Sequence, residues 1–96
     1  MNELNWDQIR NLADRKATLS TKTGVPFQVV ATSEATLTVR VSSGEEHTLS
    51  RTNLEKAVAK IQAGTKLRGP KDYRDLIADD CPAYAWAILR HLGYIK

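Results

Sequence analysis

The sequence predicts a single α+β domain in which an N-terminal helix precedes an antiparallel meander of three or four strands and three C-terminal helices. Two observations predict this class. Apolar residues recur with helical spacing towards both ends of the chain, and they alternate with polar residues in the middle. The strands are grouped together rather than alternating with helices, which is typical of α+β folds. A chain of 96 residues is the size of one domain, spanning 1–96.

The first helix is predicted over about 6–16. Asn5 can cap it, because its side chain can accept a hydrogen bond from a free N–H group of the first turn. Arg15 and Lys16 are expected in the last turn, where cations suit the helix dipole. One face of this helix is apolar and carries Trp6, Ile9, Leu12 and Ala13.

The middle of the chain follows the two-residue period of strands. A short edge strand is expected over 18–21, and a second strand over 25–30 with Pro26 near its start. Leu37, Val39 and Val41 alternate with Thr36, Thr38 and Arg40, which predicts a central strand with one buried face. A hairpin turn over 42–45 then leads to a returning strand over 46–49.

Three helices are expected after the meander. Thr52 and Glu55 have the spacing of a capping box, Leu54, Ala57, Val58 and Ile61 form an apolar face, and Gly64 ends this helix. Pro70 can open a short helix that carries Tyr73, Leu76 and Ile77. Pro82 suits the first position of the last helix, which Asp80 or Cys81 would cap. Apolar residues nearly encircle that helix, so it is predicted to be the most buried.

Composition points away from membranes and secretion. No apolar run approaches the roughly 20 residues of a membrane span. The N-terminus is polar and acidic, unlike a signal peptide. The single cysteine, Cys81, cannot form an internal disulfide, which fits a reducing compartment. We therefore expect a cytoplasmic protein with no membrane partner.

The sequence offers little to catalysis or metal binding. Cys81 and His91 lie ten residues apart on the last helix, which separates them by about 15 Å along its axis. Asp79, Asp80 and His47 are the other candidate ligands, but none has the spacing of a known metal motif. We therefore predict no enzyme activity, no catalytic residue, no metal and no cofactor.

The net charge of +3 is local. The segment 51–74 carries seven basic and two acidic residues, a charge of +5, whereas the remainder carries seven basic and nine acidic residues, a charge of −2. Such a patch on a small domain is typical of a polyanionic partner. The predicted contacts to phosphate are Lys56, Lys60, Lys66, Arg68, Lys71 and Arg74.

These cations have different structural settings. Lys56 and Lys60 are i, i+4 neighbours on the polar face of their helix, where they repel each other and a phosphate would relieve the repulsion. The others follow in or beside a Gly-bounded loop, ahead of a helix N-terminus whose free N–H groups also favour anions. Arg40 is expected to extend the patch, and Tyr73 is the one aromatic residue within it.

The resulting functional hypothesis is a non-enzymatic module that binds the phosphate backbone of DNA or RNA. A purely solvated basic surface is the alternative reading of the same residues. A second alternative is a protein-interaction or self-assembling, homodimeric subunit with no nucleic-acid role, which would use apolar surface of the last helix. Trp6, Tyr84, Trp86, Tyr94 and Ile95 are the residues available for such a contact.

Three runs of the sequence resemble a small bacterial module. They are 23–29 (TGVPFQV), 50–57 (SRTNLEKA) and 84–89 (YAWAIL). They resemble conserved bacterial proteins of unassigned function, some of which are carried on mobile elements such as integron gene cassettes or lie beside restriction genes. The resemblance implies a compact α+β domain in a mobile-gene or DNA-related setting. It implies no active site, because the matching residues are of the kind that determine a fold.

Overall fold

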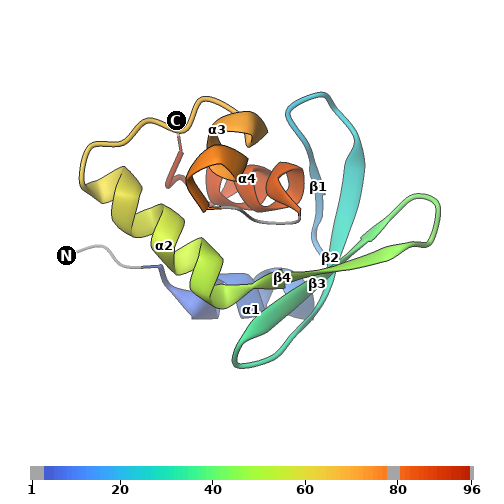
Figure 1. Cartoon of the computed structure of the whole chain (residues 1–96). Helices are drawn as coiled ribbons and strands as arrows, with labels where there is room; N and C mark the ends of the chain where they lie inside the picture. The colour runs from blue at the N-terminus through green and yellow to red at the C-terminus, as the bar shows by residue number, and fades with distance from the viewer. Residues whose placement is uncertain (1–3, 78–80, 96) are drawn as a thin grey trace.

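A computed structural model describes residues 4–77 and 81–95 of the chain (Figure 1). It confirms the predicted α+β class: one helix, a four-stranded antiparallel sheet and three further helices. The elements in order are α1 (Trp6–Asp14), β1 (Thr18–Ser20), β2 (Pro26–Thr32), β3 (Thr36–Val41), β4 (Glu46–Ser50), α2 (Arg51–Gln62), α3 (Pro70–Ile77) and α4 (Pro82–His91).

The sheet is a meander with strand order β1-β2-β3-β4. Its cross-strand pairs place apolar side chains together on one face: Leu19 lies opposite Phe27, Val29 opposite Val39, and Leu37 opposite Leu49. All six are buried. The other face carries polar residues such as Thr48 and Arg40, so the helices cover one side of the sheet only.

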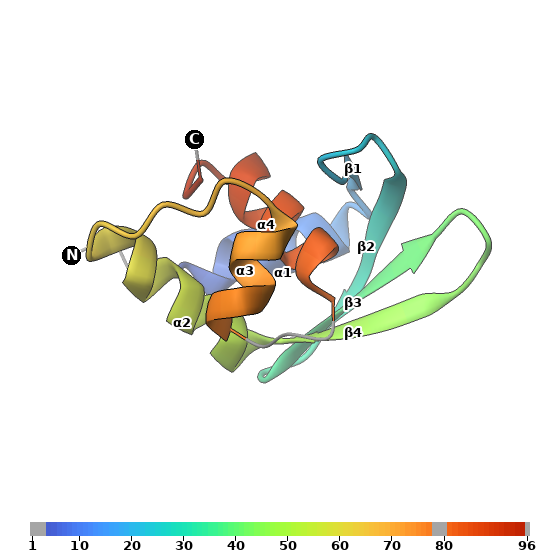
Figure 2. The same ribbon diagram turned by 45° about the horizontal axis from the view of Figure 1, so that its top comes forward.

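Helix α4 occupies the middle of the helical layer, between α3 and the sheet (Figure 2). Its residues Ala85, Trp86, Ala87, Ile88 and Leu89 are all buried, in agreement with the prediction. Cys81 takes the N-cap position but makes no capping hydrogen bond with its side chain. Asp79 and Asp80 lie outside the described residues, so the proposed carboxylate cap is not addressed. No helix within the described ranges has the length and apolar character needed to cross a membrane.

Helix α1 ends two residues earlier than predicted. Lys16 has a φ of 48°, in the left-handed region. The amide of Lys16 donates to the carbonyl of Ala13, and that of Ala17 to the carbonyl of Leu12. This pair of hydrogen bonds is a Schellman motif, which ends a helix and normally has glycine in the left-handed position. Arg15 and Lys16 therefore follow the helix instead of forming its last turn.

Helix α2 begins one residue before the predicted capping box. Ser50, the last residue of β4, is the N-cap, and its Oγ accepts a hydrogen bond from the amide of Asn53 at 3.3 Å. The assignment of Thr52 as the cap was therefore wrong. Ser50 keeps the extended backbone of the strand, which is also the conformation that an N-cap needs, so the chain passes from β4 into α2 without a loop.

Candidate nucleic-acid interface

Helix α2 exposes Lys56 and Lys60, as the periodicity predicted. Leu54, Ala57 and Val58 are buried and fix the rotation of the helix. One edge of α2, with Glu55 and Ala59, borders a hollow beside Leu4 at the start of the chain. Lys56 and Lys60 do not line this hollow and are exposed to solvent elsewhere on the helix.

The α2–α3 connection is anchored to the core by one residue. Leu67 is 5% exposed, whereas its neighbours Lys66 and Arg68 are exposed. The indole Nε1–H of Trp86 donates to the carbonyl of Leu67 at 3.0 Å, a buried hydrogen bond. The connection is therefore held by α4, and this anchoring directs the two cations beside Leu67 towards solvent.

A second tie comes from the turn between β1 and β2. The Nζ of Lys22 donates to the carbonyl of Arg68 at 3.2 Å. Gly69 is buried beneath this side chain, and a Cβ atom at Gly69 would lie 3.0 Å from the Nζ of Lys22. The absence of a side chain at Gly69 thus provides the space that the Lys22 side chain fills.

Helix α3 presents Lys71 and Arg74 to solvent. Its first turn also contains Asp72, whose Oδ2 accepts a hydrogen bond from the amide of Arg68 at 3.0 Å. The chain's own carboxylate thus supplies negative charge at this helix start. Asp72 therefore takes the place that the prediction gave to a bound anion at the N-terminus of the helix.

Tyr73 does not belong to the surface. It is fully buried, because it lies on the face of α3 that packs against α4. The expectation of an aromatic residue within the patch was wrong for this reason. Trp86 is also buried, at 3% exposure, so the exposed cations have no flat stacking platform beside them in the described part of the chain.

Some cations of the chain are paired with a carboxylate, and others are not. Arg40 donates from Nε and Nη2 to the Oε2 of Glu46, at 3.1 and 2.6 Å, and does not extend the patch. Arg74 Nε lies 4.0 Å from Asp75 Oδ1 on the same helix. Among the described residues, no carboxylate lies within 4.0 Å of the cationic groups of Lys56, Lys60, Lys66, Arg68 and Lys71.

Arg51, like Arg40, makes contacts within the protein. Its Nη1 donates to the carbonyl of Glu34 at 3.0 Å, its Nε lies 3.7 Å from Glu55, and its guanidinium lies 5.0 Å from the centre of the Trp6 ring. The residue thus joins α2 to α1 and to the turn before β3. Its charge is used within the fold.

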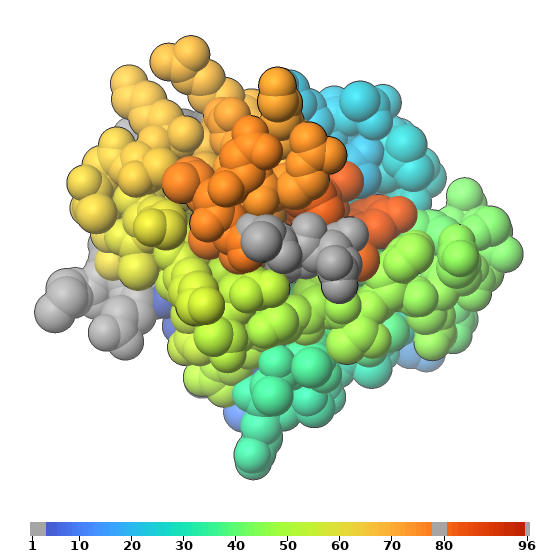
Figure 3. All heavy atoms as spheres, in the orientation of Figure 1, coloured from blue at the N-terminus to red at the C-terminus, as the bar shows by residue number. Residues whose placement is uncertain are grey.

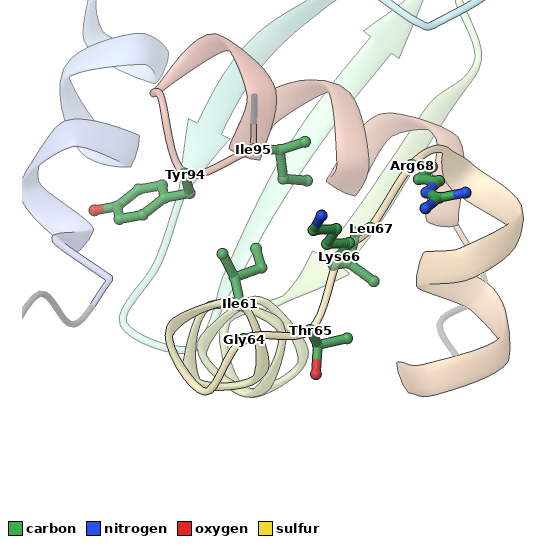
Figure 4. A pocket seen from close by; sticks show the side chains of 8 residues that line it. All are labelled: Ile61, Gly64, Thr65, Lys66, Leu67, Arg68, Tyr94 and Ile95. Carbon is green, nitrogen blue, oxygen red and sulfur yellow. The ribbon is translucent and has the colours of Figure 1, made fainter.

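Two hollows flank the α2–α3 connection. The first has a volume of about 520 Å³; Ile61 and Ile95 point into it from opposite sides, and the side chain of Thr65 points away (Figure 4). The second has a volume of about 420 Å³ and is lined by Lys66, Arg68, Asp72, Asp75 and Leu76. Two carboxylates share this hollow with two cations, so the positive potential is weaker here than along α2.

Two further cations lie next to the connection, and the sequence analysis missed both. The Nζ of Lys22 is 6.0 Å and the guanidinium carbon of Arg90 is 5.3 Å from the centre of the Trp86 ring. Lys22 stands in a turn and Arg90 in the last turn of a helix, and each has an ordinary local explanation. Only the three-dimensional fold brings both of them to the Trp86 ring and brings Lys22 to the carbonyl of Arg68.

The candidate catalytic and metal-binding residues are dispersed. His47 stacks on Tyr84 at 5.3 Å between ring centres, Cys81 is half-buried at the start of α4, and His91 is exposed at its end. Within residues 4–77 and 81–95, no three His, Cys, Asp or Glu side chains come together as a metal site.

Comparison with known proteins identifies no relative: no family model, no curated protein and no solved structure matches the chain. The likeness to mobile-element modules stays a prediction.

Proposed function

We propose that this protein is a non-enzymatic module that binds the phosphate backbone of duplex nucleic acid through the surface formed by α2, the α2–α3 connection and α3. One observation carries the proposal. Five exposed cations of this surface, Lys56, Lys60, Lys66, Arg68 and Lys71, have no carboxylate partner among the described residues. Arg40 in β3 and Arg51 at the start of α2 are used in internal contacts, whereas Arg15 and Lys16, after α1, also have no carboxylate partner among the described residues.

The elements that carry these cations lie side by side. Helices α2 and α3 are neighbours in both ribbon views, and the connection between them crosses the same end of the molecule (Figures 1 and 2). Side chains of this connection stand out from the surface in Figure 3. Charges fixed on a rigid surface attract a polyanion without the entropic cost of ordering a flexible tail.

Because the aromatic residues near this surface are buried, we favour a duplex over a single strand as the partner. Proteins that bind single strands usually stack bases on exposed aromatic rings. Tyr73 and Trp86 are buried, so the surface offers charge and little stacking. Contacts of this kind depend on the regular backbone of a duplex and carry no information about base sequence.

Fluorescence anisotropy with a labelled 20-base-pair duplex tests the proposal. Three or four phosphate contacts predict that raising the salt from about 50 to about 200 mM weakens binding by about 40- to 150-fold. The double substitution Lys56→Gln and Lys60→Gln should weaken binding strongly at the lower salt. Arg15→Gln with Lys16→Gln removes the same charge at the end of α1 and should have little effect. No binding at about 50 mM salt would refute the proposal.

The alternative of a self-assembling subunit was based on apolar surface of the last helix. Residues 85–89 of α4 are instead buried in the core of the same chain. Among the described residues, the large exposed apolar side chains are Val25, in the β1–β2 turn, and Leu76, on α3. We therefore favour the nucleic-acid hypothesis, and light scattering of the purified protein tests the homodimer directly.

A further inference from the structure

Lys22 and Arg90 extend the proposed interface in a direction that the sequence does not reveal. We propose that they form, together with Arg68, a second phosphate-binding subsite centred on the edge of Trp86. This inference rests on the proposed function, because the phosphate is that of the duplex backbone. It adds to it a contact surface built from the β1–β2 turn and α4, outside the basic segment 51–74.

The geometry brings the charges close together. Lys22 Nζ and the guanidinium of Arg90 lie 6.0 and 5.3 Å from the centre of the same indole ring, so the two cations are at most about 11 Å apart, close to one Debye length. The Nζ of Lys22 also contacts the backbone of Arg68. Lys22 and Arg90 thus contact the same indole ring, and Lys22 joins that ring to the backbone of Arg68.

Nothing in the described part of the chain neutralises this cluster. Among the described residues, no carboxylate lies within 4.0 Å of the Lys22 ammonium or of the guanidinium groups of Arg68 and Arg90, although Asp72 accepts a hydrogen bond from the backbone amide of Arg68. Both Lys22 and Arg90 are exposed, and the Lys22 ammonium has donors left after its bond to the Arg68 carbonyl. Cations held near each other without a counter-ion repel, and a phosphate bound between them removes that repulsion.

The buried indole makes these cations good ligands for phosphate. The Trp86 ring holds both side chains by cation–π attraction, which limits their freedom before any ligand arrives. Less conformational entropy is then lost on binding. Arg90 can present its planar fork to two phosphate oxygens, whereas Lys22 acts as a compact point charge.

The subsite is continuous with the main surface. Arg68 belongs to both, and the contact between Lys22 and the Arg68 carbonyl brings the β1–β2 turn to the α2–α3 connection. A duplex laid over α2 and the α2–α3 connection would therefore reach the β1–β2 turn. This continuity is the reason that we assign the subsite to the same backbone and not to a separate ligand.

Salt-dependent binding of the same 20-base-pair duplex tests the inference. Lys22→Gln with Arg90→Gln should weaken binding and reduce the slope of log K against log salt by about 2, because two phosphate contacts are lost. The charge-preserving pair Lys22→Arg with Arg90→Lys should keep the slope. Thermal unfolding of each variant establishes that it is folded.

The outcomes separate this inference from the proposed function. If the wild-type protein binds, and Lys56→Gln with Lys60→Gln weakens it while Lys22→Gln with Arg90→Gln changes neither affinity nor slope, the subsite is wrong and the function stands. If affinity falls in the Lys22 and Arg90 variant but the slope is unchanged, these residues only support the fold and the subsite is again wrong. A wild-type protein that does not bind the duplex overturns both.

Discussion

The ammonium of Lys22 lies 3.2 Å from the carbonyl oxygen of Arg68, across 46 residues of sequence. This contact ties the β1–β2 turn to the α2–α3 connection at the point where the exposed cations begin. It also explains why position 69 is glycine although its backbone is not left-handed. The lysine side chain passes where a Cβ atom of residue 69 would stand. One hydrogen bond thus sets the relative positions of two loops in the proposed interface.

Gly69→Ala should displace Lys22 without changing any charge. The new methyl group would lie 3.0 Å from Nζ and 3.4 Å from Cδ of Lys22, and the flexible end of that side chain can move away. We expect the free energy of unfolding to change by less than about 1 kcal/mol, because only the end of the Lys22 side chain has to move and alanine also lowers the entropy of the unfolded chain. Duplex affinity should fall about as far as in Lys22→Gln alone.

Anisotropy titrations and thermal unfolding of the two single variants, Gly69→Ala and Lys22→Gln, check this expectation. Gly24→Ala is not a suitable control, because Gly24 has a φ of 90° and would be strained by any side chain. An affinity of Gly69→Ala equal to that of the wild-type protein would mean that the position of Lys22 is irrelevant to binding.

Trp86→Phe should weaken both the fold and the interface. The change removes the indole donor to the Leu67 carbonyl, leaving a buried acceptor without its partner, which costs about 1–3 kcal/mol. The α2–α3 connection loses its anchor to α4, and Lys22 and Arg90 lose the aromatic ring that both contact. We expect a lower melting temperature and a lower duplex affinity.

Trp6→Phe is the matched control for that experiment. The Nε1–H of Trp6 also donates to a backbone carbonyl, that of Ser33, at the same 3.0 Å. The cost in stability should be similar, but Trp6 supports α1 and the turn before β3. Duplex affinity measured well below the melting temperature should therefore stay unchanged. Equal losses of affinity in both variants would show that the effect of Trp86 is only general destabilisation.

The elements of this fold could be predicted from sequence because each depends on local periodicity. Leu37, Val39 and Val41 alternate within six residues, and the apolar face of α2 repeats within eight, so both patterns are visible without the rest of the chain. Helix ends were less predictable. Ser50 and Thr52 are both acceptable caps, and the extended backbone at the end of β4 selects Ser50.

The candidate interface was only partly predictable for a different reason. Six of its cations are close in sequence, and counting charge was enough to find them. Lys22 and Arg90 are isolated in the sequence, and only the folded chain brings both to the Trp86 ring and Lys22 to the carbonyl of Arg68. Tyr73 was misplaced because the short α3 permits several rotations, and only its packing on α4 decides which side is buried.

Ser50→Ala should destabilise the protein by about 1 kcal/mol, the usual cost of removing an N-cap side chain. The amide of Asn53 would lose the acceptor that Ser50 Oγ provides. Thr52→Ala serves as the control, since Thr52 is exposed and lies inside the helix, where alanine is favoured. Urea unfolding of the two variants distinguishes the caps, and a larger loss for Thr52→Ala would contradict the structure.

Lys16→Gly should stabilise the protein. Lys16 has a φ of 48° at the position of the Schellman motif where glycine carries no steric cost, and a side chain there costs about 1–2 kcal/mol. Glycine also increases the entropy of the unfolded chain, so we expect a net gain of about 0.5–1 kcal/mol. For a domain of this size, that gain raises the melting temperature by a few degrees. The Lys16 carbonyl still accepts the hydrogen bond from Gln28 Nε2, since the backbone is retained. Because the change also removes a positive charge outside the proposed interface, duplex affinity should be unchanged within a factor of about two. A large loss of affinity with increased stability would show that total charge, and not the surface around Lys56 and Arg68, governs binding.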